Sequence, residues 1–275
     1  MLLDPLLLVA RLFMTGLFVL HVVNALNVPA PDGLLYAALA IQIVGIVMVA
    51  LGYKTRFAAL LLATFSALSL LLVHGRPDGG WIFITDFRKG LAVIGAFIFL
   101  FAYGPGPLSL DARRNRARPA GTEGFLSSIA GNDTLMGPLL LVGRFLPLVI
   151  FFTAGTNKIL HTAVMQEYMV NHNASVPTIL IYPAIVTQII PPLLVMLGYK
   201  TRYAALALAG FCVIAPALFH SDFGNPSEVE QFFLDFVNAG GFLFMFANGP
   251  GALSLDRRLA GHRSLASPAH QGASA

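Results

Sequence analysis

The chain has 275 residues, of which 57% are hydrophobic and only 11% are charged, and its mean hydropathy is +0.77. A soluble domain carries about 25% charged residues, so this chain has too few to cover a water-facing surface of its size. The composition excludes soluble enzymes, nucleic-acid-binding modules and disordered proteins. We expect an integral membrane protein whose first partner is lipid and not nucleic acid.

Eight apolar segments follow one another along the chain, and most approach the roughly 20 residues that a helix needs to cross a bilayer. Because their apolar runs are continuous and do not alternate with polar residues, they predict an all-α fold and not a β-barrel. The expected helices cover residues 5–26, 33–52, 56–74, 82–103, 137–160, 176–197, 202–220 and 230–247.

The basic residues are divided unequally between the two sides of the predicted membrane. With the N-terminus inside, 13 of the 17 Lys and Arg residues fall on inner connections and ends. The four that fall outside are Arg76, Arg88, Lys89 and Lys158. Cytoplasmic connections carry the excess of Lys and Arg in membrane proteins. The distribution predicts a multi-pass protein of a bacterial-type inner membrane, with both termini in the cytoplasm.

The second half of the chain repeats the first. Gly-Tyr-Lys-Thr-Arg at 52–56 recurs at 198–202, and Gly-Pro-Gly-x-Leu-Ser-Leu-Asp at 104–111 recurs at 249–256. Each half holds an even number of segments, so the repeats are parallel. We therefore divide the chain into a first four-helix repeat (1–111), a cytoplasmic Arg/Gly/Ser linker (112–136), a second four-helix repeat (137–256) and a disordered cytoplasmic tail (257–275).

These motifs resemble those of the DoxX/DoxD family of four-helix membrane proteins. The likeness includes the end of the seventh segment at Leu218-Phe219-His220, and the fifth segment, where an early Arg144 is followed by Gly155-Thr156-Asn157-Lys158. The resemblance implies duplicated parallel four-helix transmembrane bundles. It also implies a small membrane subunit of a redox system, such as thiosulfate:quinone oxidoreductase or terminal quinol oxidase.

The first half departs from that pattern. Its first segment reads Val22-Val23-Asn24-Ala25 where the fifth has Gly155-Thr156-Asn157-Lys158, so the lysine is missing. The first outer loop is also shorter than its counterpart in the second half. We therefore expect any chemistry to lie in the second half.

Two histidines, His74 and His220, end the third segment of each repeat and correspond in the repeat offset. There an imidazole could bind a quinone oxygen, exchange a proton or ligate haem. The alternative is an interfacial histidine bonded to a backbone carbonyl. Haem is the least favoured of these, because two histidine ligands must face each other at one depth in the membrane.

Two more outer residues complete the candidate site. Lys158 either anchors its helix at the interface or holds a small anion such as thiosulfate, and Asp235 could orient His220. A wider acidic group crowds the last outer loop and is interpreted as a solvated face, or as a docking patch for a basic periplasmic redox partner. Its members are Asp222, Glu228, Glu230 and Asp235.

Arg11 and Arg144 lie one to two turns inside the inner ends of their segments, where a charge is costly. Their side chains either reach back to the inner interface, which we favour, or form a buried pair that orders the helices by binding carbonyls or a headgroup.

Two functions are consistent with these residues. The protein is either a quinone-linked membrane oxidoreductase component or a non-catalytic scaffold of a larger redox complex. A transporter is a weaker third reading, because no ion-coupling carboxylate is evident at mid-depth.

The charge distribution makes a testable prediction about topology. Cysteines introduced at 113–118 should resist a membrane-impermeant thiol reagent in intact cells, because this basic segment is predicted to be cytoplasmic. Labelling of these positions from outside would contradict the assignment.

Overall fold

The computed structural model describes residues 3–27, 33–73, 80–116, 125–171, 177–220 and 222–266, and within these ranges all the regular structure is helical. The eight long helices are α1 (Leu3–Leu26), α2 (Gly33–Leu51), α3 (Thr55–Val73), α4 (Gly80–Tyr103), α7 (Asp133–Leu160), α9 (Pro177–Leu197), α10 (Thr201–Phe219) and α11 (Pro226–Asn248). The four short helices are α5 (Leu110–Arg116), α6 (Phe125–Ala130), α8 (Thr162–Asn171) and α12 (Leu255–Ala266).

The helices confirm an all-α integral membrane protein. Among the described residues, six of them are long and apolar enough to cross a membrane: α1, α2, α7, α9, α10 and α11. The apolar part of α3 is shorter, and α4 carries Arg88 and Lys89 near its start. A total of eight spans therefore stays a prediction.

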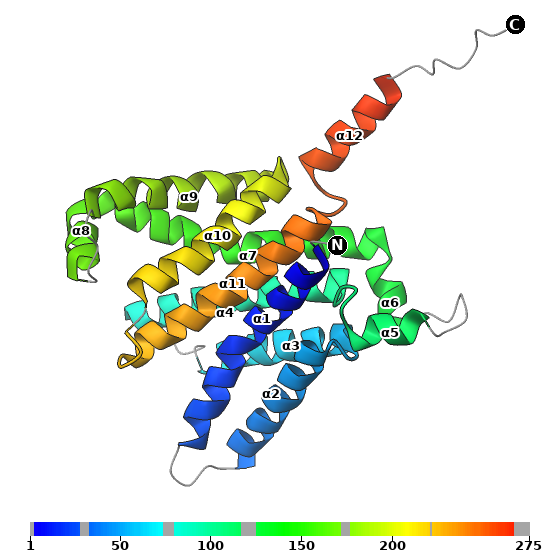
Figure 1. Ribbon diagram of the computed structural model, residues 1–275, viewed down its shortest axis with the longest axis horizontal. Coiled ribbons are helices and arrows are strands. Elements are labelled where there is room, and N and C mark those ends of the chain that lie inside the picture. The colour runs from blue at the N-terminus through cyan, green and yellow to red at the C-terminus, as the bar shows by residue number, and fades with distance from the viewer. Residues whose placement is uncertain are drawn as a thin grey trace, which may run out of the picture.

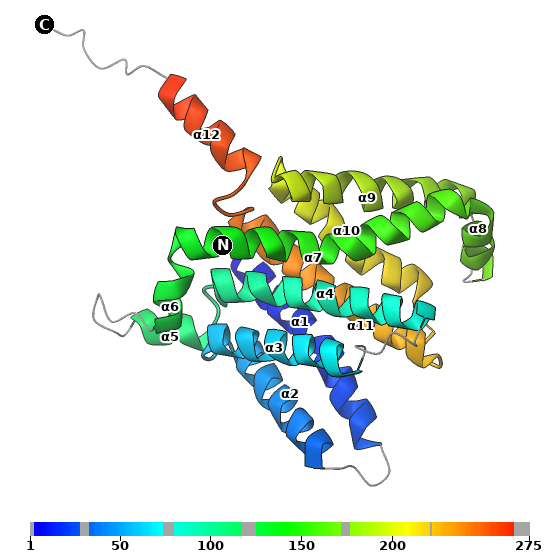
Figure 2. The same ribbon diagram turned by 180° about the vertical axis from the view of Figure 1, so that it is seen from behind.

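The two halves interlock instead of lying side by side as separate bundles. Within each half, consecutive long helices pack against each other, but the fourth helix packs mainly on the first helix of the other half. Figure 1 shows α11 between α10 and α1, and Figure 2 shows α4 between α3 and α7. The two fourth helices also contact each other. The two four-helix repeats are therefore joined through their first and fourth helices.

Glycine residues allow each fourth helix to pack closely on the first helix of the other half. A Cβ placed on Gly95 of α4 would lie 2.9 Å from the carbonyl oxygen of Gly143 in α7, and one on Gly240 of α11 would lie 2.5 Å from the carbonyl oxygen of Ala10 in α1. Helices in lipid associate through such close backbone approaches, because burial of apolar surface adds little there. Gly95 and Gly240 thus occupy corresponding places in the two interlocking contacts.

Each half contains a fully buried arginine. Arg11 and Arg144 are 1% and 0% exposed, and their Nη2 groups donate to the backbone carbonyls of Leu108 and Leu253. The favoured interpretation, in which these side chains reach back to the interface, is wrong. The alternative of buried arginines that order the helices by binding carbonyls is confirmed.

The two repeated motifs meet around each arginine. In the first half, Asp111 accepts hydrogen bonds from the backbone N–H groups of Lys54 and Thr55 at 2.7 and 2.8 Å. Asp256 does the same for Lys200 and Thr201 at 2.7 and 2.9 Å. Each carboxylate therefore fastens the closing segment of its half to the start of that half's third helix. Both motifs are structural elements of the fold.

Gly198 must lack a side chain for this arrangement to form. Its φ of +67° lies in the left-handed region, and a Cβ there would be 2.5 Å from Nη1 of Arg144. Gly52, with the same φ, faces Arg11 in the same way.

Two predicted boundaries need correction. The tail expected to be disordered from residue 257 continues helix α12 to Ala266. The linker 112–136 contains the end of α5, all of α6 and the first turn of α7, and its assignment as a linker stays a prediction. Helix α11 begins at Pro226 and not at 230, because the side chain of Asn225 caps it by accepting from the N–H of Ser227 at 3.1 Å and proline fits the first helical turn.

The buried arginine makes a prediction about stability. Gly198→Ala should lower the free energy of unfolding by about 2 kcal/mol or more, because a left-handed alanine alone costs roughly 1–2 kcal/mol and its Cβ displaces the guanidinium. Gly210→Ala is the matched control, since nothing lies within 4 Å of its Cβ position and alanine favours a helix. Thermal unfolding in detergent measures both, and equal effects would contradict the assignment.

Candidate functional site

A cavity of about 300 Å³ lies in the second half, at the end of the helices where α7 meets α8 and α10 meets α11. We call this the outer end, following the predicted topology. Its walls are mostly apolar, with Phe151, Phe211 and Phe219 among them. Its polar lining residues are Arg88, Lys89, Thr153, Asn157, Lys158, Tyr168, Gln188, His220, Gln231 and Asp235. A mainly apolar cavity with a few convergent polar groups is typical of a small-molecule site.

The structure brings together three of the residues that the sequence singled out. Lys158 from the end of α7, His220 from the end of α10 and Asp235 from α11 all line this cavity. His74, the counterpart of His220 in the first half, lies outside the described residues. The cavity is in the second half, where the sequence placed any chemistry.

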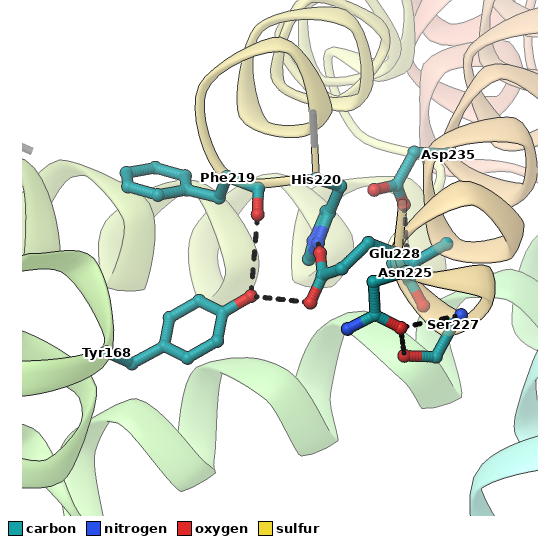
Figure 3. A network of polar contacts seen from close by, with 8 residues as sticks. Tyr168, Phe219, His220, Asn225, Ser227, Glu228 and Asp235 are labelled. Atoms are coloured by element: carbon teal, nitrogen blue, oxygen red, sulfur yellow. Dashed lines mark hydrogen bonds and ion pairs between the residues drawn. The ribbon is translucent and has the colours of Figure 1, made fainter. Parts of the chain in front are cut away.

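His220 is held by a carboxylate other than the one we expected. Its Nδ1 lies 2.5 Å from Oε2 of Glu228, and the hydroxyl of Tyr168 lies 3.3 Å from Oε1 of the same carboxylate (Figure 3). Asp235 instead accepts from Nε2 of Gln231 at 3.1 Å. Glu228 therefore orients His220. It lies in the first turn of α11, next to the end of α10, whereas Asp235 lies about two turns farther along α11.

The acidic group of the last outer loop is not simply a solvated face. The side chain of Glu228 is 15% exposed, and Glu230 forms an ion pair with Lys89 at 3.1 Å. Asp235 lines the cavity. Asp222 is exposed and accepts from the N–H of Gly224 within its own turn. Two of the four, Glu228 and Asp235, therefore face inward, whereas the side chains of Asp222 and Glu230 stay exposed.

The first half contributes two cations to the cavity of the second. Arg88 and Lys89 come from α4, which reaches the site because it packs on α7. The sequence assigned both residues to the first half's own outer loop. No local sequence signal could have assigned them to this cavity, because the packing of α4 on α7 depends on contacts between residues far apart in the chain.

Gln188 of α9 is a functional candidate that sequence reasoning missed. It lines the cavity, is 5% exposed, and its Oε1 has no hydrogen-bond partner within the described structure. The sequence offered one signal, because Gln42 and Gln188 correspond in the repeat, yet an isolated glutamine in an apolar segment did not indicate a site. Gln42 is 6% exposed and is not among the residues that line this cavity.

Two family models match the chain, one in each half. The model for DoxX matches residues 139–221, and the model for the SURF4 family matches residues 6–116. Two Escherichia coli K12 relatives are named inner membrane proteins. YqjF is 37% identical over 120 residues, covering 44% of this chain and 91% of the relative. YphA is 29% identical over 126 residues, covering 44% and 89%. No solved structure matches the chain significantly.

Tyr168 provides a test of the polar network. Burial, with a further contribution from the Glu228 carboxylate, raises the pKa of Tyr168 to about 12, from about 10 for a free tyrosine. The folded state then favours the neutral phenol, so the stability that this tyrosine contributes is present below about pH 10 and is lost as the pH rises toward 12. The phenolate absorbance that separates wild type from Tyr168→Phe should appear only near pH 12. A difference complete by pH 10 would contradict the contact.

Proposed function

This chain belongs to the DoxX family of multi-pass inner membrane proteins, and on that premise we propose that it is the quinone-binding component of a membrane redox system. The cavity is the proposed quinone site, and its outer end faces the periplasm. The proposed activity resembles that of the family's thiosulfate:quinone oxidoreductase subunits, in which a reduced sulfur compound supplies the electrons.

The observation that carries the proposal is the mixed lining of the cavity. Aromatic side chains from two helices, Phe151 of α7 and Phe211 and Phe219 of α10, offer apolar surface for a flat ring. His220 and Lys158 line the same cavity and are proposed to reach the ring oxygens. A volume of about 300 Å³ is at the lower end of the range for ligand pockets. It suits a quinone headgroup whose isoprenoid tail remains among the helices or in lipid.

His220 and the three cationic residues of the lining have roles in this reaction. A quinone takes two electrons from the donor and two protons to become a quinol. His220 exchanges one of these protons at the ring oxygen, as a positioned imidazole does in general acid–base catalysis. Lys158, with Arg88 and Lys89 in the same lining, provides positive charge that stabilises an anionic donor or a reduced ring oxygen.

A scaffold function is the second candidate, and the exposed tip of the last outer loop favours it. Phe223 is 62% exposed beside the exposed Asp222, and an exposed aromatic residue next to a charge suits a protein contact. In this case the subunit holds quinone for a larger membrane or periplasmic redox complex, whose other subunits carry the electrons.

Mutation of the histidine separates the two functions. In purified protein with its complex intact, His220→Ala should reduce thiosulfate-dependent quinone reduction by about 10²–10⁴-fold, the usual loss when a positioned acid–base group is removed. His74→Ala should have a milder effect.

The control is His161→Ala, because His161 is an exposed histidine at the end of α7 that does not line the cavity. It should retain wild-type turnover. Full turnover in His220→Ala, or none in the wild type with its complex intact, would favour the scaffold.

A further inference from the structure

We propose that the inner end of the second half binds the phosphate of an anionic phospholipid headgroup, held by Lys200, Arg202 and Arg257. These residues line a second, open cavity of about 600 Å³, formed where α10 begins, α11 ends and α12 begins. This cavity lies at the opposite end of α10 from the proposed quinone site, so the inference does not depend on the proposed function. The predicted topology places it at the cytoplasmic leaflet.

The three cations are available to a ligand. All three side chains are exposed, and within the part of the chain that the structure describes neither Lys200 nor Arg202 forms an ion pair. Arg257 pairs with Asp133 at 2.9 Å, but both side chains are more than half exposed, and such a surface pair is weak. Arginine binds phosphate oxygens through two parallel N–H groups, so the lining offers the chemistry that a phosphate requires.

The carboxylate in the same lining does not cancel this charge. The two oxygens of Asp256 accept from the backbone N–H groups of Lys200 and Thr201, so this carboxylate is occupied in holding the start of α10. The buried Arg144 lies close enough for its charge to act on Asp256. The three lining cations and Arg144 together outnumber Asp256 and Asp133, and the cavity is left with an excess of positive charge.

The surface next to the cavity favours a lipid over free phosphate. Tyr203 lines the cavity and is 77% exposed, and tyrosine is enriched where a helix enters the membrane interface. Leu206, Gly210 and Ile214 follow it at helical spacing on one face of α10. Leu206 and Ile214 are exposed, and nothing lies within 4 Å of the Cβ position of Gly210. An apolar stripe therefore leads from the cavity along the helix, where it can hold an acyl chain.

The corresponding end of the first half is more enclosed. Arg56 matches Arg202 in the repeat, but it is only partly exposed and its Nη1 is buried. In that half, the short helix α6 packs on α3 and α4. In the second half, α12 instead points away from the other helices (Figures 1 and 2). We therefore assign the lipid site to the second half.

The test measures lipid binding to the full-length protein. Protein delipidated in mild detergent is titrated with phosphatidylglycerol or phosphatidylcholine in 150 mM ammonium acetate, and bound lipid is counted by native mass spectrometry. Wild type should bind one phosphatidylglycerol at least about tenfold more tightly than phosphatidylcholine, whose ammonium group cancels the phosphate charge. Arg202→Gln should weaken phosphatidylglycerol binding by about tenfold or more, the usual loss for a hydrogen bond to a charged group.

Arg258→Gln is the matched control. It removes the same charge from an exposed residue that neighbours Arg257 but does not line the cavity. Binding should change by no more than about twofold, because salt screens exposed charges outside the site. Lys200→Gln is a second variant within the cavity and should also weaken binding, so the test does not depend on the folding of one variant.

The outcomes decide between the possible occupants. Equal weakening by Arg202→Gln and Arg258→Gln would overturn the proposal, because the general positive charge of the inner face would then explain the binding. Equal affinity for the two lipids would also overturn it. Inorganic phosphate that binds as tightly as phosphatidylglycerol, and displaces it, would assign the cavity to a free anion and overturn the lipid as its occupant.

Discussion

A buried guanidinium bound to a backbone carbonyl is the constraint around which each half of this protein is built. An arginine inside a membrane protein is tolerated only if something polar satisfies it. Here the partner is the carbonyl of Leu108 or Leu253, at the end of the half. The Gly-Pro-Gly turn presents that carbonyl. The guanidinium fits because Gly52 or Gly198 has no side chain. Asp111 or Asp256 then holds the two segments together. One interaction therefore accounts for both recurring motifs.

Much of the fold could be predicted from the sequence, because hydropathy and helix length are local properties. The eight apolar segments correspond to the eight long helices within a few residues. The exchange of the fourth helices could not be predicted. Gly95 and Gly240 carry no signal of which helix they approach, and α4 is equally apolar whether it packs on α1 or on α7. Helix caps such as Asn225 shifted the boundaries that hydropathy alone had placed.

The site was predictable to the same degree and for the same reason. Lys158, His220 and Asp235 were identified because each is a polar residue at the outer end of an apolar segment. Their pairing was not predicted, since Glu228 and Asp235 both lie on α11 and only the way in which α11 packs against α10 decides which one meets His220. Lys89 lies at the site because α4 packs on α7, a helix that begins more than forty residues farther along the chain. The position of each residue in the sequence thus predicted its depth in the membrane, but it did not predict which side chains the residue contacts.

The long separation between each arginine and its carbonyl imposes an order on biogenesis. Arg11 is 97 residues upstream of its partner, and Arg144 is 109 residues upstream. At a synthesis rate of about 5–20 residues per second, the first helix waits roughly 5–20 s in the insertion machinery or lipid before its charge can be satisfied. During that interval the ribosome, the insertase or a lipid phosphate must accommodate the guanidinium. Slowed translation between residues 11 and 108 would lengthen the interval in which Arg11 has no Leu108 carbonyl to bind.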